Sequence, residues 1–311
     1  MDSIEKAMFG RSLGSIPPPA PATRTLPAKG DVIERTADMV NDLPAVRVTA
    51  PTATKRTQRS VTLDLERIRA AGLLVPDTQP SRIKEEYRQI KRPLLMHIDG
   101  KGATISEHAN LIVVTSARPG EGKTFTACNL ALSIAAERNR TVLLVDADVI
   151  KPAVTKTLGF EAEQGLVDFL IDDQLELADV LVNTSIPSLT VLPAGSKHHL
   201  SAELLAGDNM HRLTAELSVR YPDRIVIFDS PPLLATTEAS ILTSLMGQVV
   251  MVVEAERTAQ SQVKDALAML NPNQIIGFVL NKTRDVLVPN YHGYGYGYQY
   301  AHSSEEDSEV R

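Results

Sequence analysis

The feature of this sequence that most limits its fold is a regular alternation, from Leu111 onward, of short apolar runs with stretches that suit helices. The apolar runs are LIVVTSA, TVLLVDAD, LTVLPAG, IVIFDSPP, QVVMVVEAE and QIIGFVLNK. Runs that are apolar throughout are typical of parallel strands covered by helices on both faces. The stretches TFTACNLALSIAAER, SAELLAGDNMHRLTAELSVRY and TAQSQVKDALAML suit those helices. The pattern therefore predicts an α/β fold with a doubly wound, mostly parallel sheet.

Composition and charge exclude several classes of function. The chain has 311 residues, of which 43% are hydrophobic, so it can bury one good-sized core and still carry flanking tails. Its formal net charge of −6 gives no general attraction to nucleic acid or to an anionic membrane, so we expect no nucleic-acid partner. The apolar runs are far shorter than the ~20 residues that cross a bilayer, so we expect no direct membrane span. The single cysteine, Cys128, and the lack of a secretory leader pattern favour the cytoplasm.

The segment ARPGEGKT, residues 117–124, lies between a predicted strand and a predicted helix, which is the context expected of a phosphate-binding loop. Its glycines allow backbone N–H groups to turn toward an anion, and the positive end of the following helix adds to the attraction. A lysine would reach the outer phosphates, and the threonine after it would offer its hydroxyl to Mg²⁺. We expect a nucleotide to be bound by Pro119, Gly120, Glu121, Gly122, Lys123, Thr124 and Phe125.

Three aspartates follow predicted strands. Asp146 and Asp148 end the run VLLVDAD, and their spacing places both on the same side of an extended strand. Asp229 ends the run IVIFDSPP. Ligands of open α/β sheets gather at the carboxyl ends of the strands, so we expect the three carboxylates to converge on the phosphate-binding loop. A single aspartate at such a place could merely cap a helix or turn, but together with Lys123 the three form a candidate site.

The number of acids in this set indicates the chemistry. Phosphoryl transfer needs positioning and neutralisation of charge, and a simple ATPase holds its metal with Thr124 and Asp229 alone. The additional pair leaves one carboxylate free for an acceptor hydroxyl. Our hypothesis is that Asp146 serves the acceptor, whereas Asp148 assists Thr124 and Asp229 with the metal. Lys123, Asp146, Asp148 and Asp229 are then the candidate catalytic residues.

The last predicted strand ends at Asn281, with Lys282 and Arg284 close behind. An amide at this place would suit the edge of an adenine ring, and a cation would suit its face or the ribose. A strand-terminal turn asparagine is an equally good interpretation.

The C-terminal segment YHGYGYGYQY contains five of the seven tyrosines, interspersed with glycines, in a stretch too polar and glycine-rich to form a core. Glycine gives the backbone great freedom, and the acidic sequence SSEEDSEVR follows, so the segment is predicted to be mobile and solvated. Taken alone it could be a low-complexity end without chemistry. The alternative is that it offers accessible phosphate acceptors, namely Tyr291, Tyr294, Tyr296, Tyr298 and Tyr300.

In this order, the motifs resemble those of the bacterial tyrosine kinases, or BY-kinases. ARPGEGKT resembles the family's Walker A motif, VLLVDAD its Walker A′ motif and IVIFDSPP its Walker B motif. The tyrosine-rich tail is similar to the family's autophosphorylated cluster, and EEYRQIK resembles its oligomerisation motif through Glu85 and Arg88. The segment EEYRQIKRPLL is similar in sequence to the cytoplasmic, exosortase-associated subgroup of exopolysaccharide loci (the XrtA/PEP-CTERM autokinases).

The resemblance implies a P-loop NTPase fold of the deviant-Walker (MinD/ParA-like) type, with ATP and Mg²⁺ as cofactors. It implies an autokinase that transfers the γ-phosphate to tail tyrosines of a neighbour in a homo-oligomeric ring, regulating exopolysaccharide synthesis and export. It also implies a peripheral location at the inner membrane, through a chain-length-determinant or copolymerase-type activator protein. Two positions depart from the family pattern: Ile150 stands where an arginine is usual, and Lys91 closes the oligomerisation motif in place of an arginine.

The expected organisation has four parts. Residues 1–60 are predicted to be a disordered, proline-rich leader. Residues 61–98 are predicted to be a helical docking or oligomerisation segment, with Ser81 as the N-cap of its second helix. Residues 99–286 would form the P-loop kinase domain, and residues 287–311 the flexible, tyrosine-rich acidic tail.

Two alternatives to a kinase stay open. One is a deviant P-loop ATPase of the partitioning or positioning type, which shares the sheet and the paired aspartates. That class usually carries a signature lysine where this loop has Arg118, and it has no use for the tyrosine-rich tail. The other is a scaffold without catalysis, which binds nucleotide as a switch and offers its tail to a partner.

Overall fold

The computed structural model describes residues 59–77, 79–102, 108–220 and 224–284, and the structural statements below refer to these residues. The five tail tyrosines and nearly all of the predicted leader lie outside them.

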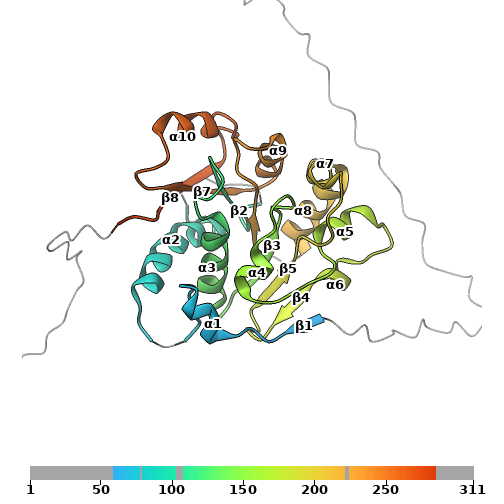
Figure 1. Ribbon diagram of the computed structural model, residues 1–311, viewed down its shortest axis with the longest axis horizontal. Helices are drawn as coiled ribbons and strands as arrows, with labels where there is room; N and C mark the ends of the chain where they lie inside the picture. The colour runs from blue at the N-terminus through green and yellow to red at the C-terminus, as the bar shows by residue number, and fades with distance from the viewer. Residues whose placement is uncertain (1–58, 78, 103–107, 221–223, 285–311) are drawn as a thin grey trace, which may run out of the picture. The chain divides into compact units, whose positions relative to one another are not determined.

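Within the described residues the strands form one eight-stranded sheet with the order β1-β4-β5-β3-β6-β2-β7-β8 (Figure 1). The strands are β1 (Arg59–Val61), β2 (Leu111–Ser116), β3 (Thr141–Asp146), β4 (Val182–Thr184), β5 (Leu189–Leu192), β6 (Arg224–Asp229), β7 (Gln248–Glu254) and β8 (Ile275–Asn281). Neighbouring strands are parallel except for β4 and β5, which are antiparallel. The predicted α/β fold with a mostly parallel sheet is therefore confirmed.

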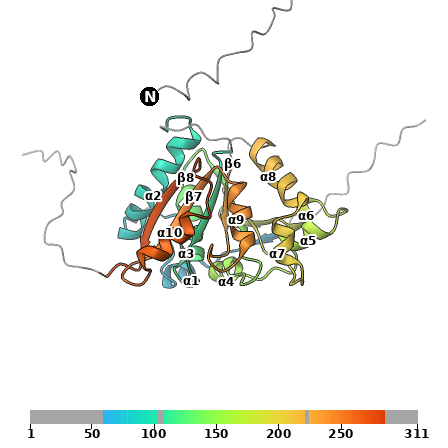
Figure 2. The ribbon, with the colours of Figure 1, turned by 90° about the horizontal axis from the view of Figure 1, so that it is seen from above.

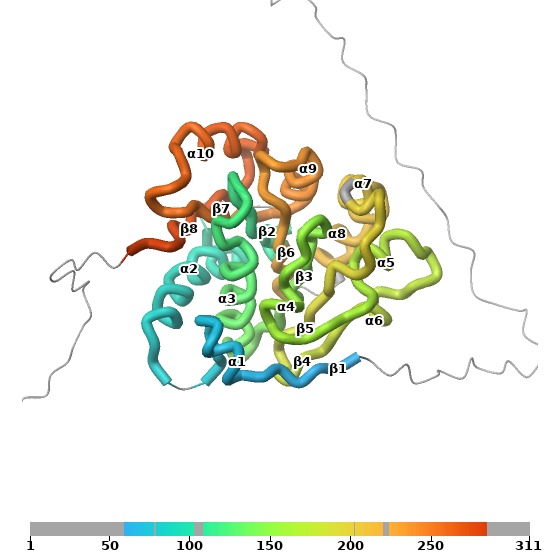
Figure 3. Tube along the Cα trace, viewed as in Figure 1, coloured from blue at the N-terminus to red at the C-terminus, as the bar shows by residue number. Residues whose placement is uncertain are grey.

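Helices cover both faces of the sheet, as the tube in Figure 3 also shows. They are α1 (Leu65–Ala70), α2 (Arg82–Ile98), α3 (Lys123–Ala135), α4 (Val154–Leu158), α5 (Leu166–Ile171), α6 (Leu177–Val180), α7 (Ser201–Leu205), α8 (Asp208–Arg220), α9 (Thr237–Ser244) and α10 (Gln260–Leu267). Alternate residues of β2 point to opposite faces: Ile112 and Val114 join the core under α1 to α4, whereas Leu111 and Val113 join the core under α5 to α10. Burial on both faces explains why the central strands are apolar throughout.

Three details differ from the sequence-based expectation. The strands β1 and β4 were not predicted, because the segments RSV and VNT are too short and too polar to give a strand pattern. Strand β1 also takes in the last two residues assigned to the leader. The stretch 201–221 was predicted as one helical run, but it forms two helices that break at Gly207, a residue that disfavours helix interiors.

The segment 61–98 packs into the same core as the sheet rather than standing apart from it. Ile68 of α1 and Tyr87 and Leu94 of α2 are buried together with residues of α3 and the strands. Figure 2 shows α2 beside β8, at the edge of the sheet. The predicted N-cap of α2 is confirmed, because the Ser81 side chain accepts a hydrogen bond from the backbone N–H of Lys84.

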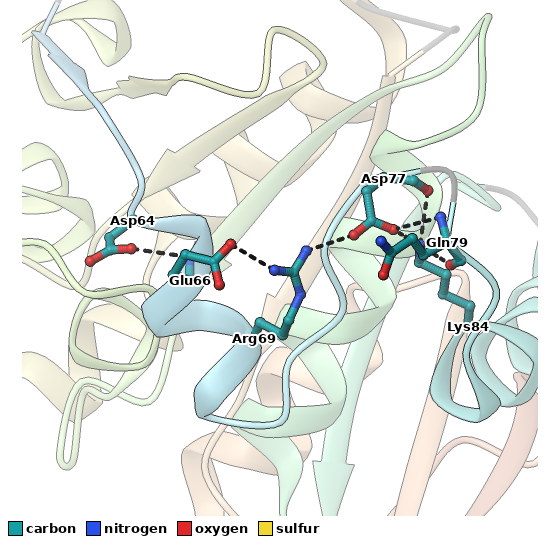
Figure 4. A network of polar contacts seen from close by, with 6 residues as sticks. All are labelled: Asp64, Glu66, Arg69, Asp77, Gln79 and Lys84. Atoms are coloured by element: carbon teal, nitrogen blue, oxygen red, sulfur yellow. Dashed lines mark hydrogen bonds and ion pairs between the residues drawn. The ribbon is translucent and has the colours of Figure 1, made fainter.

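A chain of exposed polar contacts joins α1 to the start of α2 (Figure 4). Arg69 pairs with both Glu66 and Asp77, at 2.6 and 2.8 Å, and Lys84 pairs with Asp77 as well. Hydrogen bonds from Lys84 and Arg69 lower the pKa of Asp77 to about 2. No helix among the described residues is long and apolar enough to cross a membrane.

Candidate nucleotide and phosphoryl-transfer site

The predicted phosphate-binding loop connects the end of β2 to the start of α3. Gly120 and Gly122 have φ angles of 87° and 98°, in the left-handed region that favours glycine. Gly122 is the N-cap of α3 and offers no side-chain cap, so the N–H groups of the first turn are available to an anion. This backbone is the cradle that a bound phosphate needs.

The other predicted residues of the loop have distinct surroundings. Pro119 is exposed, and Phe125, in the first turn of α3, packs against the core beside α2. The side chain of Glu121 turns into the protein and is 1% exposed; its carboxylate accepts hydrogen bonds from Arg118 N at 2.7 Å and from the Thr258 hydroxyl. Glu121 can therefore contact a phosphate only through its backbone.

The structure brings the catalytic candidates together at the carboxyl ends of β3 and β6. Asp146 and Asp229 lie opposite each other in the register of these neighbouring strands. The Thr124 hydroxyl donates to Asp229 Oδ2 at 2.6 Å, and Lys123 Nζ lies 3.9 Å from Asp148 Oδ2. The convergence predicted from the strand ends is thus present in the structure.

Each of the three aspartates has a raised pKa. Burial raises the pKa of Asp146 to about 7, and the nearby charge of Asp148 adds to the effect. Burial raises the pKa of Asp229 to about 8, with a further contribution from the charge of Asp146. Burial also raises the pKa of Asp148, which Lys123 partly offsets. Three buried carboxyl groups close together repel one another when they are ionised, so the site favours binding of a cation.

Two oxygens of this cluster are ready to accept a ligand. Asp146 Oδ2 accepts from the backbone N–H groups of Ala153 and Val154, at 3.1 and 3.0 Å, but Asp146 Oδ1 is buried without a hydrogen-bond partner. Asp229 Oδ1 is likewise buried and unpartnered. Buried polar atoms without partners are rare. Asp229 Oδ1 is a hard oxygen donor of the kind that Mg²⁺ prefers, whereas Asp146 Oδ1 is open to the acceptor that our hypothesis assigns to Asp146.

The donor set fits a magnesium ion that is bound together with a nucleotide. Among the described residues, no group of three His, Cys, Asp or Glu side chains is arranged to hold a metal alone. Mg²⁺ in phosphoryl-transfer sites usually takes one or two carboxylates, with waters and phosphate oxygens completing its shell. Thr124, Asp148 and Asp229 are the side chains predicted to hold it: Asp229 accepts from the Thr124 hydroxyl, and Asp148 lies 3.9 Å from Lys123 Nζ.

The loop after Asp148 supplies few cations. Ile150, where the resemblance implied an arginine, is 50% exposed. The neighbouring Lys151 is exposed, its N–H donates to Asp148 Oδ1 at 3.1 Å, and its charge helps to lower the pKa of Asp148.

The predicted oligomerisation residues lie on the surface of α2. Arg88 and Glu85 form an ion pair with each other, and their side chains are 67% and 55% exposed. Lys91, the third residue of that motif, is instead buried: its Nζ donates to the Ser133 carbonyl at 2.7 Å and pairs with Glu137 at 2.6 Å. The ring itself stays a prediction.

Sequence reasoning missed the contacts that brace the loop from outside. Asn281 Nδ2 donates to the Glu121 carbonyl at 2.8 Å, so this amide faces the loop. Thr258 lies in the turn after β7, and no motif marks its hydroxyl as a partner of Glu121. A tertiary contact of this kind leaves no local signal in a sequence.

The mostly parallel sheet, the loop at the end of β2 and the aspartates at the ends of β3 and β6 define a P-loop NTPase. A family model described as "AAA domain" matches residues 109–275. The tyrosine-protein kinase YwqD of Bacillus subtilis is 32% identical over 208 residues, covering 66% of this chain and 83% of that protein. The succinoglycan biosynthesis transport protein ExoP of Rhizobium meliloti is 32% identical over 216 residues, covering 68% of this chain and 26% of that protein.

Among solved structures, the chimerical protein CapA2B2 superposes with a TM-score of 0.57 and 25% identity, covering 72% of this chain and 93% of that one. The chain belongs to this AAA-domain family and, within it, to the bacterial tyrosine kinases. It spans about a quarter of the length of several other curated relatives that it matches.

Proposed function

We propose that the chain is an ATP-dependent protein-tyrosine autokinase. The observation that supports this most strongly is the tyrosine-rich segment 291–300, for which a partitioning ATPase with the same sheet and the same paired aspartates has no use. The kinase name of the B. subtilis relative, 83% of which aligns with this chain, points the same way. The acceptors would be the tyrosines of the segment 291–300 of a neighbouring copy.

The chemistry assigned to each residue follows from its place. Lys123 and the N–H groups of the loop would bind the β- and γ-phosphates of ATP, and Mg²⁺, when bound, would neutralise charge on those oxygens. The tyrosine oxygen would form a bond to the γ-phosphorus while the bond from phosphorus to the β–γ bridging oxygen breaks, which releases ADP. Asp146 would take the phenol proton, since its raised pKa of about 7 suits a general base near neutral pH.

The segment between the kinase domain and the first tail tyrosine contains enough residues for that tyrosine to reach beyond its own domain. From Thr283 to Tyr291 the chain can extend at most ~28 Å, at ~3.5 Å for each residue. Each phosphotyrosine would add about −1.5 to −2 charges, so five would add roughly −8 to −10 next to an already acidic end. Such tails would repel one another. We therefore expect phosphorylation to loosen the ring, and particles of equal size before and after incubation with ATP would contradict this.

The setting of the reaction is also a proposal. The relative ExoP is named a succinoglycan biosynthesis transport protein, which supports a role for this chain in exopolysaccharide synthesis or export. A chain-length-determinant or copolymerase-type membrane protein would then recruit the kinase to the inner membrane and activate it.

Transfer between copies can be tested by mixing two variants, neither of which can label its own tail. One carries Lys123→Met with an intact tail, and the other has an intact loop with its five tail tyrosines changed to phenylalanine. With labelled ATP and Mg²⁺, we expect label only on the first chain and only in the mixture. Free phosphate without labelled tyrosine would favour the partitioning ATPase instead. Neither labelled tyrosine nor free phosphate, with nucleotide still bound, would favour the scaffold. Equal labelling of the Lys123→Met chain alone, with no other kinase present, would contradict the role assigned to Lys123.

A further inference from the structure

The end of β8 holds two consecutive backbone carbonyls of the phosphate-binding loop. Lys282 Nζ donates to the Gly120 carbonyl at 2.7 Å, and Asn281 Nδ2 donates to the Glu121 carbonyl at 2.8 Å. The two donors are adjacent residues at the end of an edge strand. They lie 162 and 160 residues along the chain from the carbonyls that they hold.

These two bonds fix the orientation of two peptide planes. In a planar trans peptide the carbonyl of one residue and the N–H of the next point in opposite directions. A Gly120 carbonyl held by Lys282 therefore directs the N–H of Glu121 to the other side, and a Glu121 carbonyl held by Asn281 does the same for the N–H of Gly122. The side opposite β8 is where an anion would be cradled.

The close approach of Asn281 explains why position 122 is a glycine. A Cβ at Gly122 would lie 2.0 Å from Asn281 Nδ2, and the φ angle there is 98°. The Asn281 amide thus occupies the space that a side chain at this position would need. A side chain at position 122 would force the Asn281 amide to move, and the positive φ angle there favours glycine independently.

Further contacts brace the same loop from the turn after β7. The Glu121 carboxylate, which is 1% exposed, accepts from Arg118 N at 2.7 Å, from the Thr258 hydroxyl and from Glu254 N at 3.5 Å. Lys282 Nζ also lies 3.3 Å from Glu254 Oε2, so the β8 lysine is itself held in place.

We propose that Asn281 and Lys282 are positioning residues, which hold the loop so that the N–H groups of Glu121 and Gly122 face the bound phosphates. The proposal rests on the proposed function only in that the loop binds a nucleoside phosphate. It gives Asn281 a role that does not depend on the base, unlike the predicted contact with adenine. Preorganised donors bind an anion more tightly because the cost of ordering them is already met.

The test compares nucleotide affinity among variants of the full chain, using a fluorescent ADP analogue with Mg²⁺. Loss of one hydrogen bond of this kind is expected to weaken ADP binding ~2- to 10-fold, for Asn281→Ala and for Lys282→Met. Lys282→Arg keeps a donor and should bind ADP as the unaltered chain does. Arg82→Met is the control: it removes a cation at the start of α2, whose side chain is 69% exposed and pairs with Glu86 at 2.7 Å.

Two further measurements distinguish a residue that positions the loop from one that contacts the base or takes part in phosphoryl transfer. Bound phosphates help to restore the loop, so the KM for ATP should rise with the Kd while kcat at saturating ATP changes less. The affinities for ADP and GDP should fall by the same factor in Asn281→Ala, because the lost contact is with the loop and not with the base. If Asn281→Ala proves unstable by thermal melting, Asn281→Asp removes the donor at nearly equal size and should weaken both nucleotides alike.

Unchanged ADP affinity in both Asn281→Ala and Lys282→Met would overturn the proposal, and so would a loss confined to adenine nucleotides. Because ADP binding is measured without phosphoryl transfer, these outcomes are independent of whether the tail is phosphorylated. A chain that never labels tyrosine but shows the expected loss of ADP affinity would reject the kinase and keep the positioning role.

Discussion

Lys91 offers the sharpest test of how α2 is attached to the rest of the chain. The sequence suggests that this lysine closes an oligomerisation motif, but in the structure it is 8% exposed and its Nζ reaches the Ser133 carbonyl at 2.7 Å, in the last turns of α3. Replacing it with methionine keeps most of the apolar stem and removes the charged donor. We expect Lys91→Met to destabilise the fold without changing residues on the outer surface.

The size of the effect can be worked out from the contacts. A hydrogen bond from a charged group contributes about 1.5–3 kcal/mol. The additional pair with Glu137 contributes little, since the Glu137 side chain is 45% exposed and ion pairs at exposed sites are worth ~0–1 kcal/mol. The predicted loss is therefore about 2 kcal/mol, which corresponds to roughly 4–8 °C in Tm for a domain of this size.

The assay is thermal unfolding at fixed protein concentration, combined with particle sizing. Glu137→Gln is the control and should lower the Tm by no more than ~2–4 °C, the shift that ~1 kcal/mol produces. If Lys91→Met keeps the Tm of the unaltered chain but loses the oligomer, the intramolecular contact is not what holds Lys91, and the interpretation as an oligomerisation residue stands.

Three further predictions concern the site and its surroundings. Gly122→Ala should abolish ADP binding while the chain stays folded, because the new Cβ would lie 2.0 Å from the Asn281 amide at a φ angle of 98°; retained binding would contradict the account of the loop. Asp146→Asn should abolish tyrosine labelling but keep ADP binding, since the amide oxygen can still accept from Ala153 and Val154, and simultaneous loss of both would refute the division of roles. Burial raises the pKa of Tyr87 from 10.0 to about 12, so its contribution to stability is full below pH 10 and is lost as the pH rises through 12. Tyr87→Phe should flatten the fall in stability between pH 10 and 12. An unchanged slope in this range would count against the buried position of the Tyr87 hydroxyl.

Much of the fold could be predicted because burial on both faces leaves a strong local signal. The strands β2, β3, β6 and β7 are apolar throughout, and each was predicted within a few residues of its bounds. The phosphate-binding loop was predicted from the motif ARPGEGKT between a strand and a helix. The convergence of Asp146, Asp148 and Asp229 followed from the rule that ligands gather at the carboxyl ends of parallel strands.

What could not be predicted depends on tertiary contacts. The strands β1 and β4 are three residues long and depend on pairing across the sheet, β1 with β4 and β4 also with β5. Glu121 looked like a nucleotide contact because it stands in the loop, but the partner of its carboxylate, Thr258, lies 137 residues further along the chain. The sequence left Asn281 open as an adenine contact or as a turn residue at the strand end, and only the folded chain shows that its amide faces the loop.

The central claim is that Lys123 and the three aspartates move the γ-phosphate of ATP onto the tyrosines of a neighbouring tail. The most direct measurement is mass spectrometry of the segment 291–300 after incubation of the full chain with ATP and Mg²⁺ and with a membrane activator supplied. We expect phosphate on these tyrosines in the unaltered chain and none in Lys123→Met. A segment that stays unmodified while ATP is consumed would contradict it.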